Sequence, residues 1–162
     1  MDALKRAKFI YTTSFLITSS FESLMKVARY ATDNDIPFGL NLSAPFLIQF
    51  NLEQVLQALE HASYVFGNED ESAAFGKSQG MPDGSTCAEV GKVIAQYKKL
   101  SNGPRTAILT QQAEPTVVVC GMPGIEEFTV KEYPIPPIPA EELVDSNGAG
   151  DSFVGGFLTE FY

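Results

Sequence analysis

The sequence predicts an α/β protein with a mainly parallel central sheet and an antiparallel hairpin at its edge. Short apolar runs alternate three times with amphipathic helical patterns, which is the order that builds a parallel sheet. Two further β patterns then follow each other with only a turn between them, as in a hairpin. The chain has 162 residues, of which 44% are hydrophobic, so we expect residues 1–162 to form a single domain or most of one.

The first two strand–helix units lie in the early part of the chain. Residues 9–18 are rich in β-branched and aromatic side chains and are predicted to form a buried strand. Ser19 and Glu22 have the spacing of a capping box, which predicts the start of a helix. Residues 38–42 form the next strand, and apolar residues recur at helical spacing through residues 51–62.

The third unit begins with a short strand at residues 64–66, which a short acidic helix follows. Thr86 and Glu89 again have capping-box spacing, and the helix after them carries apolar side chains at a helical period. Residues 106–110 form the fourth strand. Because a helix separates each strand from the next, we expect these four strands to run parallel.

The antiparallel edge comes next. Residues 116–120 and 125–130 are predicted strands, and the glycines and proline between them indicate a turn. Residues 133–139 contain four prolines, which lack the N–H donor that a central strand needs. This stretch is predicted to be an extended connector; the alternative is a ligand for a proline-recognition domain.

Composition excludes several classes of function. Eleven basic against twenty acidic residues give a formal charge of −9, which argues against nucleic-acid binding. No stretch reaches the roughly 20 apolar residues that cross a bilayer, so we expect no membrane insertion. Cys87 and Cys120 allow at most one bridge and are expected to be reduced thiols, which indicates the cytoplasm, with the nucleus as an open alternative. His61 is expected to interact with a helix dipole.

A glycine-rich turn near the C-terminus predicts a phosphate site. Gly148, Ala149 and Gly150 precede an apolar helical pattern, so their N–H groups are expected at a helix N-terminus, which binds anions. Asp151 follows in the first turn. A carboxylate beside a phosphoryl group is useful when it accepts the proton of an attacking hydroxyl, which indicates a kinase. The alternative is that the glycines only make a tight bend.

The whole stretch at residues 145–151 resembles the Asp-Thr-x-Gly-Ala-Gly-Asp signature of the ribokinase-like family of sugar and nucleoside kinases, with Ser146 where threonine is usual. The resemblance implies that Asp151 is the catalytic base, that Gly148 to Gly150 form the anion hole and that Asn147 contacts the nucleotide. It also implies a three-layer fold.

A second match is Asn68 and Glu71, which resemble the Asn-x-x-Glu motif of this family. The resemblance implies that both side chains hold the water shell of Mg²⁺, an ion that keeps several waters and binds few protein carboxylates. The alternative is an acidic helix start that favours the positive end of the helix dipole.

A third match, residues 40–46, is similar to the adenosine-kinase branch of the family. It implies that Asn41 lies near the nucleotide phosphates and that Phe46 contacts the nucleoside; the alternative for Phe46 is a core position. Thr110 is expected near the nucleotide, or is an ordinary strand-end threonine. Gln112 stands where relatives usually have glycine, and a side chain there has the size to crowd the nucleotide; its effect on nucleotide binding stays open.

Together these matches imply ATP-dependent phosphorylation of the 5′-hydroxyl of adenosine to give AMP, as in purine salvage, with Mg²⁺ and ATP required. Family members are longer, so we expect this chain to be an incomplete kinase that lacks the lid and the terminal helices. The alternatives are a truncated, non-catalytic nucleotide-binding or interaction module, and a related sugar kinase. The oligomeric state stays open.

Overall fold

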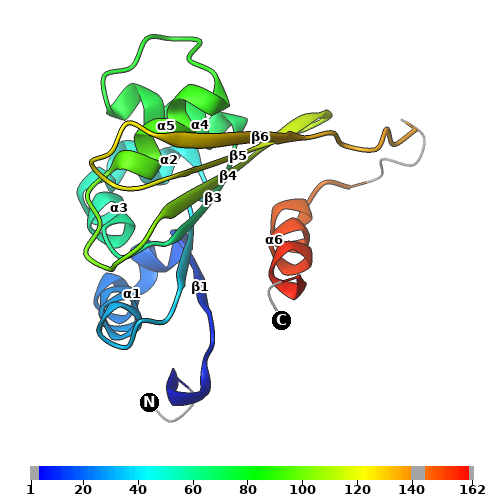
Figure 1. Ribbon diagram of the computed structural model, residues 1–162. Helices are drawn as coiled ribbons and strands as arrows, with labels where there is room; N and C mark the ends of the chain where they lie inside the picture. The colour runs from blue at the N-terminus through cyan, green and yellow to red at the C-terminus, as the bar shows by residue number, and fades with distance from the viewer. Residues whose placement is uncertain (1–3, 140–144, 161–162) are drawn as a thin grey trace.

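The computed structural model describes residues 4–139 and 145–160. In these residues six strands form one sheet in the order β1-β2-β3-β4-β5-β6 (Figure 1). Strands β1 to β4 run parallel, and β5 and β6 continue the sheet as antiparallel strands. The predicted α/β class, with a mainly parallel sheet and an antiparallel edge, is confirmed. The bounds are β1 Ile10–Thr13, β2 Phe38–Asn41, β3 Tyr64–Asn68, β4 Arg105–Gln111, β5 Glu114–Gly121 and β6 Phe128–Tyr133.

Helices lie on both sides of the sheet. Figure 1 shows α1 to α5 on one side and α6 on the other. A short 3-10 helix, Leu4–Arg6, precedes β1. No helix in the described ranges combines the length and the apolar character that a bilayer span requires. The bounds are α1 Phe15–Asp33, α2 Pro45–Phe50, α3 Leu52–Leu59, α4 Glu69–Ser78, α5 Cys87–Gln96 and α6 Ala149–Thr159.

The main core lies between the sheet and the helices of the α1–α5 side. Leu24 of α1, Val55 of α3 and Val90 of α5 are fully buried there. Each large aliphatic side chain buried in this way contributes about 1.5–3 kcal/mol. The predicted start of α5 is confirmed, because Thr86 and Glu89 exchange both capping-box hydrogen bonds.

A smaller cluster joins α6 to the opposite face of the sheet. Val154 of α6 packs with Phe66 of β3 and Ile108 of β4, and all three are buried. The ring of Phe157 meets the ring of Phe66 edge-on, with centroids 5.4 Å apart. The start of α6 lies beside the carboxyl ends of the parallel strands, because Gly148 and Gly150 line the same pocket as Asn41 and Asn68.

The first strand is shorter than predicted. β1 ends at Thr13 and α1 begins at Phe15, whereas the strand was expected to reach residue 18. The reason is the pairing of β1 with β2. Thr13 pairs with Asn41, where β2 ends, so the backbone groups of a longer β1 would have no strand to bond to.

Other boundaries also differ from the predictions. α1 has a kink at Ser20, whose Oγ accepts the Ser23 N–H (3.4 Å), so the cap lies one residue after the predicted Ser19. The helix predicted over residues 51–62 is α3 alone and is preceded by α2, whose Pro-initiated turn was not predicted. β6 starts three residues later than predicted because a longer turn separates it from β5.

His61 is buried after α3, where its Nδ1 and the Thr32 Oγ1 share a hydrogen bond of 2.7 Å. Burial lowers the pKa of His61, and the positive charge of Arg29 lowers it further. The imidazole is therefore neutral near pH 7, and the expected role of a charged partner for a helix dipole is wrong.

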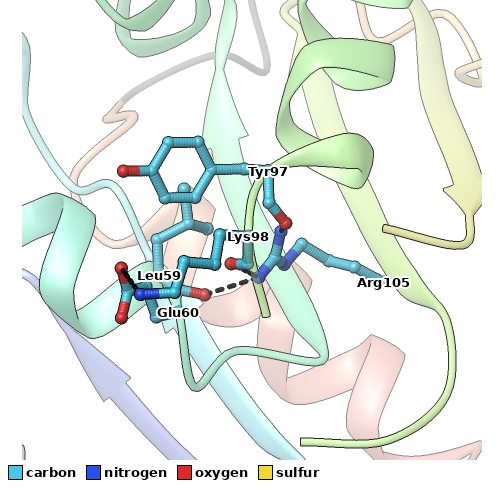
Figure 2. Close-up of polar contacts among 5 residues, drawn as sticks. All are labelled: Leu59, Glu60, Tyr97, Lys98 and Arg105. Atoms are coloured by element: carbon cyan, nitrogen blue, oxygen red, sulfur yellow. Dashed lines mark hydrogen bonds and ion pairs between the residues drawn. The ribbon is translucent and has the colours of Figure 1, made fainter. Parts of the chain in front are cut away.

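Arg105, at the start of β4, is the largest fully buried side chain in the described residues (Figure 2). Its guanidinium donates to five backbone carbonyls that lie at the C-terminal ends of α3 and α5 or just beyond them. Burial lowers the pKa of Arg105 to about 10, which still leaves it charged near pH 7. Nearby, Lys98 forms an ion pair with Glu60 at 3.0 Å. The five acceptors are the carbonyls of Leu59, Ala62, Ile94, Tyr97 and Lys98.

Candidate active site

A pocket of about 610 Å³ opens where the carboxyl ends of the parallel strands meet the N-terminus of α6. Ligands of α/β sheets bind at this edge, because the strand ends and the helix starts both present free polar groups there. Asn41 ends β2, Asn68 ends β3 and Thr110 lies near the end of β4. The lining residues are Thr13, Phe15, Asn41, Ser43, Phe66, Gly67, Asn68, Glu71, Ile108, Thr110, Ser146, Asn147, Gly148, Gly150, Asp151, Phe153 and Val154.

The start of α6 forms one wall of this pocket. Gly148 is the N-cap and has a left-handed backbone (φ 74°), which glycine adopts without strain. Among the described residues, no atom lies within 4 Å of a Cβ built on Gly148 or Gly150, so a ligand can approach the backbone closely. The Ala149 N–H instead donates to the Ser146 carbonyl (3.1 Å). Asp151 is exposed and lines the pocket.

Hydrogen bonds fix the side chain of Asn41. Its Oδ1 accepts the Ser43 N–H (2.9 Å), and its Nδ2 donates to the Tyr11 hydroxyl (3.1 Å). The Asn41 carbonyl accepts the hydroxyl of the buried Ser14 (2.7 Å). Ser43 has φ 69°, a conformation that few non-glycine residues adopt, and these bonds hold it there.

Asn68 and Glu71 form the capping box of α4. Asn68 Oδ1 accepts the Glu71 N–H (2.9 Å), and Glu71 Oε2 accepts the Asn68 N–H (3.1 Å). Glu71 is only 5% exposed. Burial raises its pKa, while the backbone amides of Asn68 and Ser43 lower it. Both side chains line the pocket and also cap α4, and their role as magnesium-site residues stays a prediction.

Two exposed aromatic side chains contact each other beside the pocket, and one of them lines it. Phe15 is 48% exposed and Phe46 is 47% exposed, and their ring centroids are 6.1 Å apart. The alternative that Phe46 is a core residue is therefore wrong. Of the two, only Phe15 lines the pocket, whereas Phe46 contacts Phe15 and lies outside the lining.

Gln112 does not line the pocket. It has φ 49°, in the left-handed region that favours glycine, and its Nε2 donates to Glu69 Oε1. This bond holds the side chain at the start of α4, outside the lining of the pocket. Thr110 does line the pocket, and its hydroxyl donates to the Gly67 carbonyl (3.4 Å).

Charge in the pocket is unusual for an anion site. The lining residues include the carboxylates Glu71 and Asp151 but no Lys, Arg or His side chain. Within the described ranges, no group of three or more His, Cys, Asp and Glu side chains could hold a metal ion by itself. Among these lining residues, the groups suited to attract an anion are therefore the backbone amides and the dipole at the start of α6.

Most of the predicted site residues meet at this pocket. Ala149 and Phe46 are outside its lining. Sequence reasoning did not find Phe15, Ser43 or Tyr11. Phe15 and Ser43 each lie two residues beyond the end of a strand, β1 and β2 respectively, so a search of the positions after each strand would have found them. The predicted residues that line the pocket are Asn41, Asn68, Glu71, Thr110, Asn147, Gly148, Gly150 and Asp151.

A glycine-rich helix start with a carboxylate in its first turn lines the pocket at the carboxyl edge of the parallel sheet, an arrangement typical of α/β proteins that bind phosphate groups. The model of the pfkB family of carbohydrate kinases matches residues 1–162, and the chain belongs to this family.

The chain is similar to adenosine kinase 1 of Arabidopsis thaliana, with 39% identity over 158 residues, which is 97% of this chain and 44% of the relative. Adenosine kinase of Schizosaccharomyces pombe is 36% identical over 96% of this chain and 44% of its own length. The resemblance to adenosine kinases is confirmed. The chain spans less than half the length of these relatives.

Solved structures show the same fold. Anopheles gambiae adenosine kinase in complex with P1,P4-di(adenosine-5) tetraphosphate has a TM-score of 0.87 and 37% identity, covering 99% of this chain and 46% of that one. Adenosine kinase of Schistosoma mansoni in complex with adenosine and AMP has a TM-score of 0.84, 29% identity and coverage of 99% and 45%. The predicted ribokinase-like architecture, present here in part, is confirmed.

Proposed function

We propose that this chain is part of a kinase that transfers the γ-phosphoryl group of ATP to the 5′-hydroxyl of adenosine, giving AMP and ADP. The observation that carries the proposal is the position of Asp151, exposed in the first turn of α6 and lining the pocket beside open glycine backbone. The similarity to adenosine kinases supports adenosine as the acceptor.

In the proposed reaction the 5′-oxygen attacks the γ-phosphorus, and the bond from that phosphorus to the bridging oxygen of ADP breaks. The hydroxyl proton passes to the Asp151 carboxylate. Gly148 to Gly150 form the anion hole, and the amides and dipole of α6 stabilise the charge that develops on the phosphoryl oxygens. Of these residues, Gly148 and Gly150 line the pocket.

The pocket residues fit Mg²⁺. This ion keeps several waters and binds through one or two carboxylates plus substrate phosphates, so it needs no dedicated protein cage. The side-chain oxygens of Asn68 and Glu71 are suited to accept hydrogen bonds from the waters of such an ion. The lining residues include no basic side chain that would compete with Mg²⁺ for the phosphates. Bound Mg²⁺ would neutralise phosphate charge.

We assign the nucleotide to the side of the pocket that Asn41, Thr110 and Asn147 line. We assign the nucleobase of the acceptor to the exposed ring of Phe15, which lines the pocket and has Phe46 beside it, because exposed aromatic rings stack with planar ligands. The described cysteines are free, which suits a cytoplasmic enzyme, with the nucleus as the second compartment.

A second candidate is a non-catalytic module that binds nucleotide. It is favoured by one observation, that the pocket lining has two carboxylates and no Lys, Arg or His side chain to stabilise a phosphoryl group in transfer. In that case the phosphate site would stay open to water, and chemistry would need groups from elsewhere.

Isothermal titration with ATP and with adenosine, followed by a turnover assay with adenosine, ribose and fructose, separates these candidates when it is done on a polypeptide that contains this chain. Binding of both ligands together with adenosine-dependent ADP formation supports the kinase. Binding of ATP alone without turnover supports the module. Turnover with a sugar but not with adenosine would assign a sugar kinase, and absence of ATP binding would contradict the proposal.

A further inference from the structure

Tyr11 is a half-buried tyrosine beside the pocket to which the proposed reaction gives no role. It lies on β1 and faces the layer of α6. Its ring meets the ring of Phe66 edge-on, with centroids 5.9 Å apart, and Phe66 in turn packs against Phe157 of α6. The phenol is therefore held between the sheet and the helix that carries Asp151.

The hydrogen bonds of Asn41 show what the Tyr11 hydroxyl does. Ser43 N–H donates to Asn41 Oδ1, so the amide oxygen is fixed on that side and Nδ2 must point toward Tyr11. One N–H of Nδ2 donates to the hydroxyl oxygen. Among the described residues the second N–H has no acceptor, so it is available to a ligand in the pocket, which Asn41 lines.

The hydroxyl is suited to this task because it stays neutral. Burial raises the pKa of Tyr11, the hydrogen bond from Asn41 lowers it, and the negative charges of Asp151 and Glu71 raise it. A neutral phenol accepts the Asn41 N–H without adding another negative charge to a pocket that already has two carboxylates.

We propose that Tyr11 is a positioning residue, whose hydroxyl holds the Asn41 carboxamide in the orientation in which its free N–H donates to the phosphates of ATP. The inference rests on the proposed function, because it assumes that ATP occupies this pocket. Tyr11 acts through Asn41 and does not itself contact the nucleotide.

The test compares four variants of the full 162-residue chain with wild type: Tyr11→Phe, Asn41→Ala, the double variant, and Tyr30→Phe as a matched control. Tyr30 is a half-buried tyrosine of α1, on the other side of the sheet. We expect Tyr11→Phe to weaken ATP binding about 3- to 10-fold, the range of one lost hydrogen bond. Asn41→Ala should weaken it at least as much, and Tyr30→Phe should leave it unchanged.

The double variant separates positioning from a direct contact. If Tyr11 acts through Asn41, the double variant binds ATP no more weakly than Asn41→Ala alone. In a polypeptide with turnover, Tyr11→Phe should raise KM for ATP more than it lowers kcat. The side-chain amide resonances of Asn41 should shift in Tyr11→Phe and not in Tyr30→Phe.

Unchanged ATP affinity and unchanged Asn41 resonances in a folded Tyr11→Phe would overturn this inference alone, provided that Asn41→Ala weakens binding. Additive losses in the double variant would also overturn it, because they indicate an independent contact. Absence of ATP binding by the wild-type chain would overturn both this inference and the proposed function.

Discussion

The helices on the two faces of the sheet are attached by different sets of contacts. On the face of α1 to α5, a large buried cluster and the five hydrogen bonds of Arg105 tie helices and strands together. On the other face, α6 rests on a cluster of three buried residues, centred on Val154. Among the described residues, no atom lies within 4 Å of a Cβ built on Gly155 or Gly156.

This difference separates a closely packed scaffold from α6, the helix that carries the proposed catalytic base. The closely packed layer fixes the strand ends that carry Asn41 and Asn68, whereas the helix that carries Asp151 is attached through few contacts. Elements with few buried contacts open locally at lower free energy than the core. We therefore expect substitutions on the two faces to change different properties, global stability on one and nucleotide binding on the other.

The largest expected effect on stability is in the scaffold. Arg105→Met removes all five donors and leaves carbonyls at the ends of α3 and α5 without partners, so unfolding free energy should fall by about 3 kcal/mol or more. Urea denaturation of the chain measures this loss. Arg29→Met, at an exposed position of α1, is the control and should change stability little. A loss below about 1 kcal/mol for Arg105→Met would contradict the role given to it.

A smaller and more local effect is expected on the other face. Val154→Ala removes two buried methyl groups from the contact of α6, at a cost of about 2 kcal/mol. Hydrogen exchange should become faster in α6 and stay unchanged in β3 and β4. Val90→Ala in α5 is the matched control and should accelerate exchange throughout. Equal acceleration of all elements by Val154→Ala would show that the two faces unfold as one unit.

The smallest effect concerns Gln112. Its left-handed backbone favours glycine, so Gln112→Gly should be about 1 kcal/mol more stable than Gln112→Ala, although both lose the hydrogen bond to Glu69. Thermal unfolding of the two variants gives this difference. Equal stability would mean that the backbone strain at residue 112 is released elsewhere.

Much of the architecture was predictable because local patterns determine it. Hydrophobic periodicity located the strands and helices of the parallel sheet, and the capping box of Thr86 and Glu89 located the start of α5. The glycine-rich turn located the start of α6. The motif residues then met at one pocket because the carboxyl ends of parallel strands share one edge.

Features that depend on distant partners were not predictable. The five acceptors of Arg105 come from separate segments, and no sequence pattern marks them. The end of β1 depends on where its neighbour β2 ends, and not on the β-branched residues that continue beyond Thr13. Phe46 looks like a core residue by its type, and only the three-dimensional position beside Phe15 shows it exposed.

The most direct test of the account is Asp151→Asn in a polypeptide that contains this chain and shows turnover. Glu160→Gln, the same change at the other end of α6, serves as control. The account predicts that Asp151→Asn lowers kcat by about 10²–10⁴-fold, because the base is lost. ATP affinity should stay equal or rise slightly, because a carboxylate near the phosphates is neutralised. Wild-type kcat in Asp151→Asn, or loss of ATP binding in parallel with kcat, would contradict the claim that Asp151 is the catalytic base.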